Sequence, residues 1–259
     1  MNQTFSPTAL EGRRALVTGG ARGIGEAIGR TLSSMGAELV IADVNLELAQ
    51  ALAEELQAGG AKAEAVTVDL RDREATLDFA RSVGAVDVLV NNAAPTQSNS
   101  PFMETPDSEW ELQFSVILWA PIVLVREFGQ GMADRGRGSI VNILSTSARS
   151  PAAFVAPYAA AKAALEIVTK VTALELGPRG VRSNAIAPAF VPTERNRPVW
   201  DRVGFTEGAM QANPLGRLAT PLDMASTVAW LVSDAASYVN GQVVTVDGGS
   251  SAGVFMAKP

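Results

Sequence analysis

Short apolar runs alternate with longer amphipathic stretches along most of the chain. The apolar runs cover residues 14–19, 38–43, 63–69, 86–92, 138–145, 181–188 and 242–247. The stretches with helical spacing of apolar residues cover 23–36, 46–58, 72–83, 107–133, 157–176 and 221–232. Because the short runs are apolar at most positions rather than at alternate ones, they indicate parallel strands that are covered on both faces.

Seven strands separated by helices predict a single α/β domain over residues 1–259, with a doubly wound seven-stranded parallel sheet and helices on both faces. No linker or low-complexity segment interrupts the alternation. Residues 1–12 precede it as an N-terminal extension. Residues 193–215 are the least regular part of the chain.

Composition narrows the classes of partner. The chain of 259 residues is 47% hydrophobic and 19% charged, which suits a large core and argues against disorder. Its net charge of −6, without a basic cluster, argues against nucleic acid or an anionic membrane as a partner. The longest apolar run, 116–125, is about half of what a bilayer requires. With no signal-like N-terminus, we expect a soluble, cytoplasmic protein.

The sequence contains no cysteine and no histidine. The first absence excludes disulfides, thiolate catalysis and thiolate metal sites, and the second removes the commonest general base and metal ligand. A carboxylate-only Mg²⁺ or Ca²⁺ site stays open, but no DxDxDG-like run supports one, so we predict no metal. Proton transfer at neutral pH must therefore use a different side chain.

A glycine-rich segment, TGGARGIG at 18–25, joins the first strand to the first helix. Gly19 permits the turn, Gly23 lets the backbone approach a pyrophosphate, and Gly25 allows close packing of helix on strand. The helix N-terminus then offers free N–H groups to the phosphates. Glycines alone would also fit an ordinary tight turn. The predicted cofactor-binding residues of this loop are Gly19, Arg22, Gly23, Ile24 and Gly25.

Asp43 ends the second strand, where an acid can accept hydrogen bonds from ribose hydroxyls. It could instead be a solvated residue or the cap of the next helix. A carboxylate at this position would repel the 2′-phosphate of NADP, whereas Arg22 in the loop would favour that phosphate. Because Asp43 would lie directly against the ribose, the sequence predicts NAD as the cofactor.

With these residues in place, the chain resembles the short-chain dehydrogenase/reductase family, in its form of about 250 residues with a Rossmann-type fold. The resemblance covers nearly the whole chain. It rests on TGGARGIG at 18–25, VDL at 68–70, NNAA at 91–94, Ser145 with YAAAK at 158–162, NAIAPAFVPT at 184–193 and GQVVTVDGG at 241–249.

The resemblance implies that residues 193–215 form a lid over the substrate site, and it implies roles for further residues. Beyond the glycine loop, the implied cofactor contacts are Asp69 and Leu70 at the adenine, Asn91 and Ala93 along the dinucleotide, and Pro188, Val191 and Thr193 at the nicotinamide carboxamide. The catalytic residues would be Ser145, Tyr158 and Lys162. Three positions depart from the family pattern: Ala94 and Ala189 replace glycines, and Ile117 stands where the family has a catalytic asparagine.

Tyr158 is one of two tyrosines, and Lys162 follows it four residues later. On a helix the two side chains share a face. An ammonium and the positive nicotinamide ring would both stabilise a phenolate on the tyrosine. An exposed helical pair would have the same spacing. Together with Ser145, which can hydrogen-bond the substrate oxygen, the pair predicts tyrosine as the general acid/base.

The predicted function is hydride transfer between NAD and a medium-sized, apolar or cyclic secondary alcohol or the corresponding ketone. Phe154, Phe190 and Trp200 could line its pocket together with Ser145, although ordinary packing would also account for these aromatic residues. Arg195 and Arg197 could meet an acidic substrate group, but the sequence favours solvated charges.

Two other functions stay open: an NAD-binding sensor or scaffold that has lost its catalysis, and an isomerase or lyase that retains its NAD.

The helices at 107–133 and 157–176 are apolar over most of their circumference, which fits the homotetramer usual in the family.

Overall fold

A seven-stranded sheet, parallel throughout, forms the centre of the computed structural model, which describes residues 6–202 and 204–253. Its strands are β1 (Arg14–Thr18), β2 (Glu38–Asp43), β3 (Ala63–Thr67), β4 (Val88–Asn91), β5 (Gly138–Ile143), β6 (Val181–Pro188) and β7 (Val243–Val246). Their order in the sheet is β3-β2-β1-β4-β5-β6-β7. The chain reverses its direction of winding between β1 and β4, which is where such sheets bind ligands.

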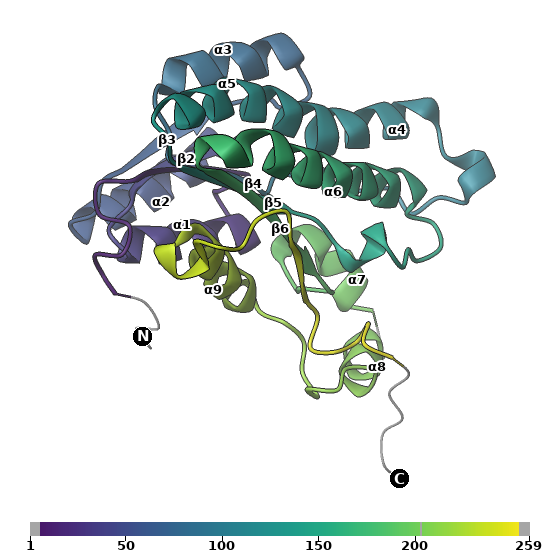
Figure 1. Ribbon diagram of the computed structural model, residues 1–259. Helices are drawn as coiled ribbons and strands as arrows, with labels where there is room; N and C mark the ends of the chain where they lie inside the picture. The colour runs from purple at the N-terminus through teal and green to yellow at the C-terminus, as the bar shows by residue number, and fades with distance from the viewer. Residues whose placement is uncertain (1–5, 203, 254–259) are drawn as a thin grey trace.

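Helices cover both faces of the sheet (Figure 1). One face carries α1 (Gly23–Ser34), α2 (Leu46–Ala58) and α9 (Pro221–Val232), and the other carries α3 (Arg73–Val83), α4 (Asp107–Phe114), α5 (Ala120–Asp134) and α6 (Ala156–Leu176). Two short helices, α7 (Arg197–Trp200) and α8 (Phe205–Gln211), lie after β6. The doubly wound architecture predicted from the sequence is confirmed.

The core has two main layers, one on each side of the sheet. Ile28 and Leu32, one turn apart on α1, are fully buried against the sheet, and Leu124 and Met132 of α5 are fully buried on the opposite side. Burying each of these side chains contributes about 1.5–3 kcal/mol. The extension before β1 joins the core as well, because Leu10 is fully buried and its N–H donates to the carbonyl of Met35 (2.8 Å).

The helical stretch from Asp107 to Asp134 is continuous but not uniform. Its middle turn, η2 (Ser115–Trp119), is a π-helix, and the N–H of Ala120 reaches back five residues to the carbonyl of Ser115. Pro121 follows and has no N–H for the carbonyl of residue 117, so the wider turn accommodates a proline inside the helix. The predicted helix at 107–133 therefore exists, with a π turn that periodicity did not predict.

By length and composition alone this 28-residue stretch could cross a membrane. Its α5 half instead packs on α3 and on the sheet.

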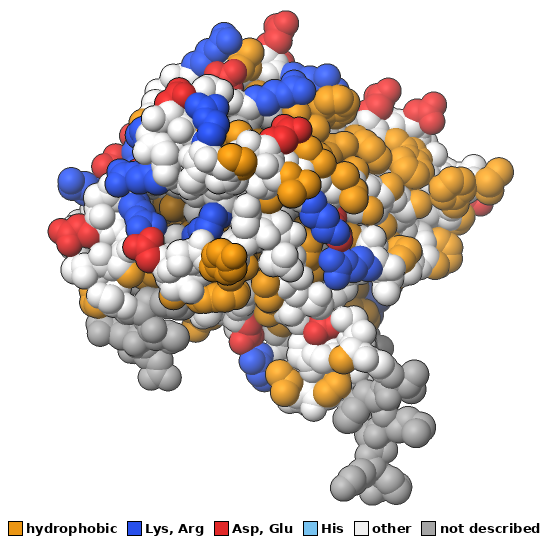
Figure 2. Space-filling model, in the orientation of Figure 1, with side chains coloured by type: hydrophobic (Ala, Val, Ile, Leu, Met, Phe, Trp, Pro, Cys, Tyr) orange, Lys and Arg blue, Asp and Glu red, His pale blue; other side chains and the backbone are white. Residues whose placement is uncertain are grey.

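The outer surface of α4, α5 and α6 is rich in apolar side chains (Figure 2). Trp119, Ile167, Val171 and Leu174 are exposed although they are large and hydrophobic, and Leu174 is 77% exposed. Burying such a surface is favourable, so it is a candidate for contact with another macromolecule.

Candidate active site

The glycine loop folds tightly at the end of β1. Gly19 and Gly23 both have φ of +60°, a conformation that L side chains rarely adopt. A Cβ atom on Gly25 would overlap the carbonyl oxygen of Gly19, so only glycine fits there. Asn92, just after β4, holds the loop in place, because its Nδ2 donates to the carbonyls of Thr18 (3.0 Å) and Gly19 (2.9 Å).

The N-terminus of α1 is left without a side-chain cap. Arg22 precedes the helix in an extended conformation and caps nothing, whereas Asn45, Asp72 and Thr220 cap α2, α3 and α9. The first N–H groups of α1 are therefore free to bind an anion, with the positive end of the helix dipole behind them. This geometry fits the pyrophosphate of a dinucleotide, as the sequence predicts.

Asp43 lies at the end of β2, beside the glycine loop. Its Oδ2 accepts from the N–H of Ala21 (3.1 Å) and its Oδ1 from the N–H of Asn45 (3.0 Å). It is half-buried, while Arg22 is exposed. The backbone bonds fix the carboxylate at the edge of the predicted cofactor site, but the caps of α2 and α3 are Asn45 and Asp72, so Asp43 is not a helix cap.

Asp69 and Leu70 follow β3 with their side chains already engaged. The Asp69 carboxylate binds the Arg71 guanidinium, which holds the pKa of Asp69 below its usual range. The side chain of Leu70 is buried in the core layer that includes α3 and α5. If this segment meets an adenine, Leu70 can do so through its main chain.

Asn91 is buried inside the sheet rather than open to a ligand. Its Nδ2 donates to Oδ1 of Asn142 on β5 (2.8 Å), and Nδ2 of Asn142 donates to Oγ1 of Thr169 on α6 (2.8 Å). Ala93 is half-buried and its N–H donates to Oγ1 of Thr18 (3.2 Å). The Asn91 side chain thus joins β4, β5 and α6, and a cofactor contact at Asn91 stays a prediction.

Ser145, Tyr158 and Lys162 gather at the carboxyl end of β5. Ser145 starts the turn η3 (Thr146–Ala148), which packs against α6. Tyr158 and Lys162 lie one turn apart on α6, and the Lys162 ammonium is 5.7 Å from the centre of the Tyr158 ring. Lys162 also donates to the carbonyl of Ile143, two residues before Ser145, so the lysine links α6 to the strand that carries the serine.

Lys162 is buried to 2% exposure, and that burial lowers its pKa from 10.5 to about 7. The nearby positive charge of Arg195 contributes to this lowering. Desolvation disfavours the ammonium, and a negative charge placed near it would offset that cost. A phenolate on Tyr158 is such a charge. The lysine is therefore suited to stabilising the deprotonated tyrosine, which a solvated lysine would do weakly.

The segment after β6 closes over the glycine loop. Pro188 and Val191 are buried, and Thr193 lies against Gly23, where an added Cβ atom would be 3.2 Å from Thr193 Cγ2. Trp200 is half-buried and its Nε1 donates to the carbonyl of Thr193 (3.1 Å). The implied nicotinamide-binding segment therefore lies against the predicted pyrophosphate loop.

The predicted substrate aromatics fall in different places. Phe190, which precedes the lid, packs edge-on against Phe205 of α8 in the lid, with ring centroids 4.8 Å apart. Phe154 has φ of +71°, is 55% exposed and lines a groove of about 600 Å³ with Phe102 and Trp110. The groove is also lined by Ser147 and by Ala156, Ala159, Ala160 and Ala163 of α6, and a substrate contact at Phe154 stays a prediction.

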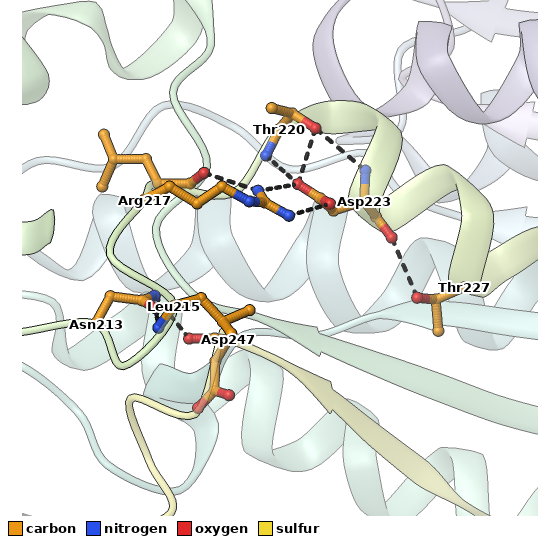
Figure 3. A network of polar contacts seen from close by, with 8 residues as sticks. Asn213, Leu215, Arg217, Thr220, Asp223, Thr227 and Asp247 are labelled. Carbon is orange, nitrogen blue, oxygen red and sulfur yellow. Dashed lines mark hydrogen bonds and ion pairs between the residues drawn. The ribbon is translucent and has the colours of Figure 1, made fainter. Parts of the chain in front are cut away.

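The downstream end of the lid is tied to the body by polar contacts (Figure 3). Asn213 is buried and its Nδ2 donates to the carbonyl of Asp247, just after β7 (3.0 Å). Arg217 forms two bonds of 2.8 Å to the Asp223 carboxylate, which also caps α9 together with Thr220. The Arg217 guanidinium holds the pKa of Asp223 well below its usual range.

Comparison with known proteins agrees with this geometry. The family model for enoyl-(acyl carrier protein) reductase matches residues 19–251. A 2,3-dihydro-2,3-dihydroxybenzoate dehydrogenase of Bacillus subtilis (strain 168) is 35% identical, over 95% of this chain and 98% of its own. An L-xylulose reductase of Bos taurus is 38% identical, over 93% and 97%. The chain belongs to the short-chain dehydrogenase/reductase family. It is accordingly related to oxidoreductases that use a nicotinamide cofactor.

Solved structures of this family superpose closely. A proposed NAD(P)-dependent gluconate 5-dehydrogenase of Beutenbergia cavernae, with bound NADP, has a TM-score of 0.91 and 39% identity, covering 96% of this chain and 100% of that one. A gluconate 5-dehydrogenase of Burkholderia cenocepacia J2315, in complex with NADP and tartrate, has a TM-score of 0.89 and 34% identity, covering 96% and 99%.

Within the family pattern, Ile117 is the main departure, and the structure places it in the π turn, buried to 1% exposure. Sequence reasoning missed Thr18 and Asn92, which tie the glycine loop to β4 through several hydrogen bonds. The signal for Asn92 was the second asparagine of NNAA. The position of Arg195 near Lys162 was also missed, since sequence offers no sign of that contact.

Proposed function

We propose that the protein is an NAD-dependent oxidoreductase that interconverts a secondary alcohol and the corresponding ketone, with Tyr158 as the general acid/base. One observation carries the proposal. A lysine buried to 2% exposure lies one helical turn from Tyr158 and binds the end of the strand that leads to Ser145. Burying a lysine is costly, and a role beside an ionising tyrosine accounts for it.

Each side chain has a distinct part in the reaction. Ser145 hydrogen-bonds the substrate oxygen, and Tyr158 Oη takes the hydroxyl proton during oxidation or returns it during reduction. The Lys162 ammonium stabilises the phenolate. When bound, the nicotinamide accepts or supplies the hydride. The uncapped N-terminus of α1 would hold the pyrophosphate, and Asp43 the adenosine ribose.

NAD rather than NADP is favoured by Asp43. Its carboxylate is held by two backbone N–H groups at the end of β2, where a 2′-phosphate would meet a fixed negative charge. Two structural relatives carry NADP, so the family alone does not select the cofactor. Arg22 offers a counter-charge but is exposed.

The relatives suggest a polyhydroxylated substrate. Their names include gluconate, xylulose and dihydrodihydroxybenzoate, all of which carry secondary alcohols or the matching ketone, and one related structure holds tartrate. Trp200 lies in the lid, Phe190 packs against Phe205 of the lid, and both Trp200 and Phe190 would line the pocket. We further propose a homotetramer, because the apolar surface of α4–α6 needs a cover (Figure 2).

The test uses NAD⁺ and NADP⁺ with a panel of sugar alcohols, sugar acids and cyclic diols, and follows absorbance of the reduced cofactor. Tyr158→Phe should lower kcat by about 10²–10⁴-fold and leave NADH binding intact. Tyr238→Phe is the matched control, because the only other tyrosine is fully exposed. Tyr158→Phe retaining more than a tenth of kcat would refute the proton role. NADH binding without turnover of any alcohol would favour a sensor.

A further inference from the structure

Arg195 lies near Lys162 of the candidate active site, in the segment that follows β6. It belongs to the turn η5 (Glu194–Asn196), which is fixed by bonds from the Thr193 N–H to Asn196 Oδ1 (2.8 Å) and from Asn196 Nδ2 to the carbonyl of Val191 (2.8 Å). Arg195 Nη1 crosses to the end of β4 and donates to the carbonyls of Ala94 (3.0 Å) and Pro95 (3.2 Å). The guanidinium is half-buried between the lid and the segment after β4.

This guanidinium has no carboxylate partner among the described residues. Arg197, two residues later, is exposed and pairs with Glu194 and Asp201. Among the described residues, the hydrogen bonds of Arg195 all come from Nη1. The N–H groups of Nε and Nη2 therefore stay available to a ligand. Those two nitrogens form the planar fork that matches a carboxylate.

The charge of Arg195 also reaches the catalytic residues. It lowers the pKa of Lys162, so the two cations lie close enough to repel each other. Lys162 bonds to a carbonyl, and Arg195 bonds to two. Two neighbouring cations with only carbonyl partners favour an anion between the lid and α6. A substrate that brings its own negative charge would relieve this repulsion.

We propose that Arg195 binds the carboxylate of the substrate, and that the substrate is therefore a hydroxy acid, whose reacting secondary alcohol is on the same carbon chain or ring as the carboxylate. The inference rests on the proposed oxidoreductase function and narrows its substrate class. The carboxylate occupies the Nε and Nη2 side of the guanidinium, while Nη1 keeps its two carbonyl bonds and holds the orientation.

A purely structural role makes a different prediction. If Arg195 only holds the lid against the segment after β4, its loss would lower kcat/KM for acidic and neutral substrates alike. Matched substrates therefore separate the two roles. D-Gluconate and D-glucitol differ only in a carboxylate against a hydroxymethyl group, and so do 3-hydroxycyclohexanecarboxylate and 3-(hydroxymethyl)cyclohexanol. L-Tartrate and L-threitol are a matched pair for binding.

The experiment measures kcat/KM for both members of each substrate pair in the wild type, Arg195→Ala, Arg195→Lys and the control Arg197→Ala. Binding of tartrate and threitol to the protein loaded with NADH is measured by calorimetry. Arg195→Ala should lower kcat/KM for the acid about 10- to 100-fold, the effect of losing a charge-assisted bidentate bond, and change the neutral value less than threefold. Arg195→Lys should fall between, and Arg197→Ala should resemble the wild type.

Three outcomes would overturn the inference while leaving the proposed function intact: a wild type that prefers the neutral member of each pair, an acid preference unchanged in Arg195→Ala, or equal losses for acid and neutral substrates. If no alcohol or acid is oxidised with either cofactor, the proposed function itself fails and the inference falls with it. Loss of tartrate binding in Arg195→Ala alone, with threitol unaffected, would support the inference independently of turnover.

Discussion

Lys162→Met should make the cofactor-free protein more stable while it abolishes turnover. A pKa lowered from 10.5 to about 7 corresponds to about 5 kcal/mol of cost for keeping the ammonium in the folded protein. Methionine has a similar shape and no charge, so it removes that cost. It also leaves the Ile143 carbonyl without its donor, which costs about 1–3 kcal/mol. At pH 6 the net gain should be about 2–4 kcal/mol.

The gain should shrink as the pH rises. Burial makes the pKa of Lys162 lower in the folded protein than in the unfolded chain. Below pH 7 the lysine is therefore charged in both states, and the full cost of burying the ammonium reduces the free energy of unfolding. Between about pH 7 and 10.5 the folded protein has lost the proton and the unfolded chain still binds it, so wild-type stability rises with pH relative to the variant. From pH 6 to pH 9 the difference should narrow by about 2–3 kcal/mol.

The assay is equilibrium urea unfolding of the cofactor-free wild type and variant at pH 6 and pH 9, at one protein concentration. Lys62→Met serves as control, because Lys62 is exposed in the turn before β3. It should change the free energy of unfolding little at either pH. A Lys162→Met variant that is destabilised at pH 6, or whose difference from the wild type is the same at both pH values, would show that burial of the Lys162 ammonium does not destabilise the folded protein.

Three further predictions concern single positions. Asp43→Ala should reduce the ratio of kcat/KM for NAD⁺ over NADP⁺ at least tenfold, and a wild type favouring NADP⁺ tenfold would contradict the cofactor assignment. Because Pro121 has no N–H to donate to the carbonyl of Ile117, we expect that carbonyl to hold a water that exchanges protons between Lys162 and solvent. Pro121→Ala should restore the donor and lower kcat, with NADH binding and folding unchanged, and an unchanged kcat would refute this relay. The stabilisation that Asp223 gains from Arg217 is present above about pH 4 and lost as the pH falls through its depressed pKa, so Asp223→Asn should flatten the acid side of the stability profile. An equally steep loss of stability below pH 4 in that variant would place the acid-sensitive group elsewhere.

The fold was predictable because its signals are local. The strand at 38–43 and the helices at 46–58 and 221–232 have the bounds that the sequence indicated. Both helices begin directly after a capping residue, Asn45 in one and Thr220 in the other. The glycine loop and the Tyr158–Lys162 spacing are equally local, and the structure brings them to the same edge of the sheet. A parallel sheet places the ends of its strands there whatever the side chains are.

The rest depends on contacts between distant parts of the chain. Asn92 and Gly19 are 73 residues apart, and Arg195 and Ala94 are 101 residues apart. The local pattern of the sequence therefore predicts neither hydrogen bond. The groove that Phe154 lines with Trp110 and Ser147 also joins distant parts of the chain, and a substrate contact at Phe154 stays a prediction. The π turn at Ser115–Trp119 also escaped prediction, because its apolar pattern matches that of an ordinary helix.

The buried amide chain through Asn91 and Asn142 has a consequence for how the strands find their alignment during folding. The central strands are apolar on both faces, so sliding β4 along β5 by one residue would cost little hydrophobic burial. Asn91 and Asn142 are direct partners in the observed alignment, and a slip would separate them and take from the buried Asn91 amide its bond to Asn142. The pair therefore favours the observed strand pairing in a sheet whose apolar residues do not distinguish it.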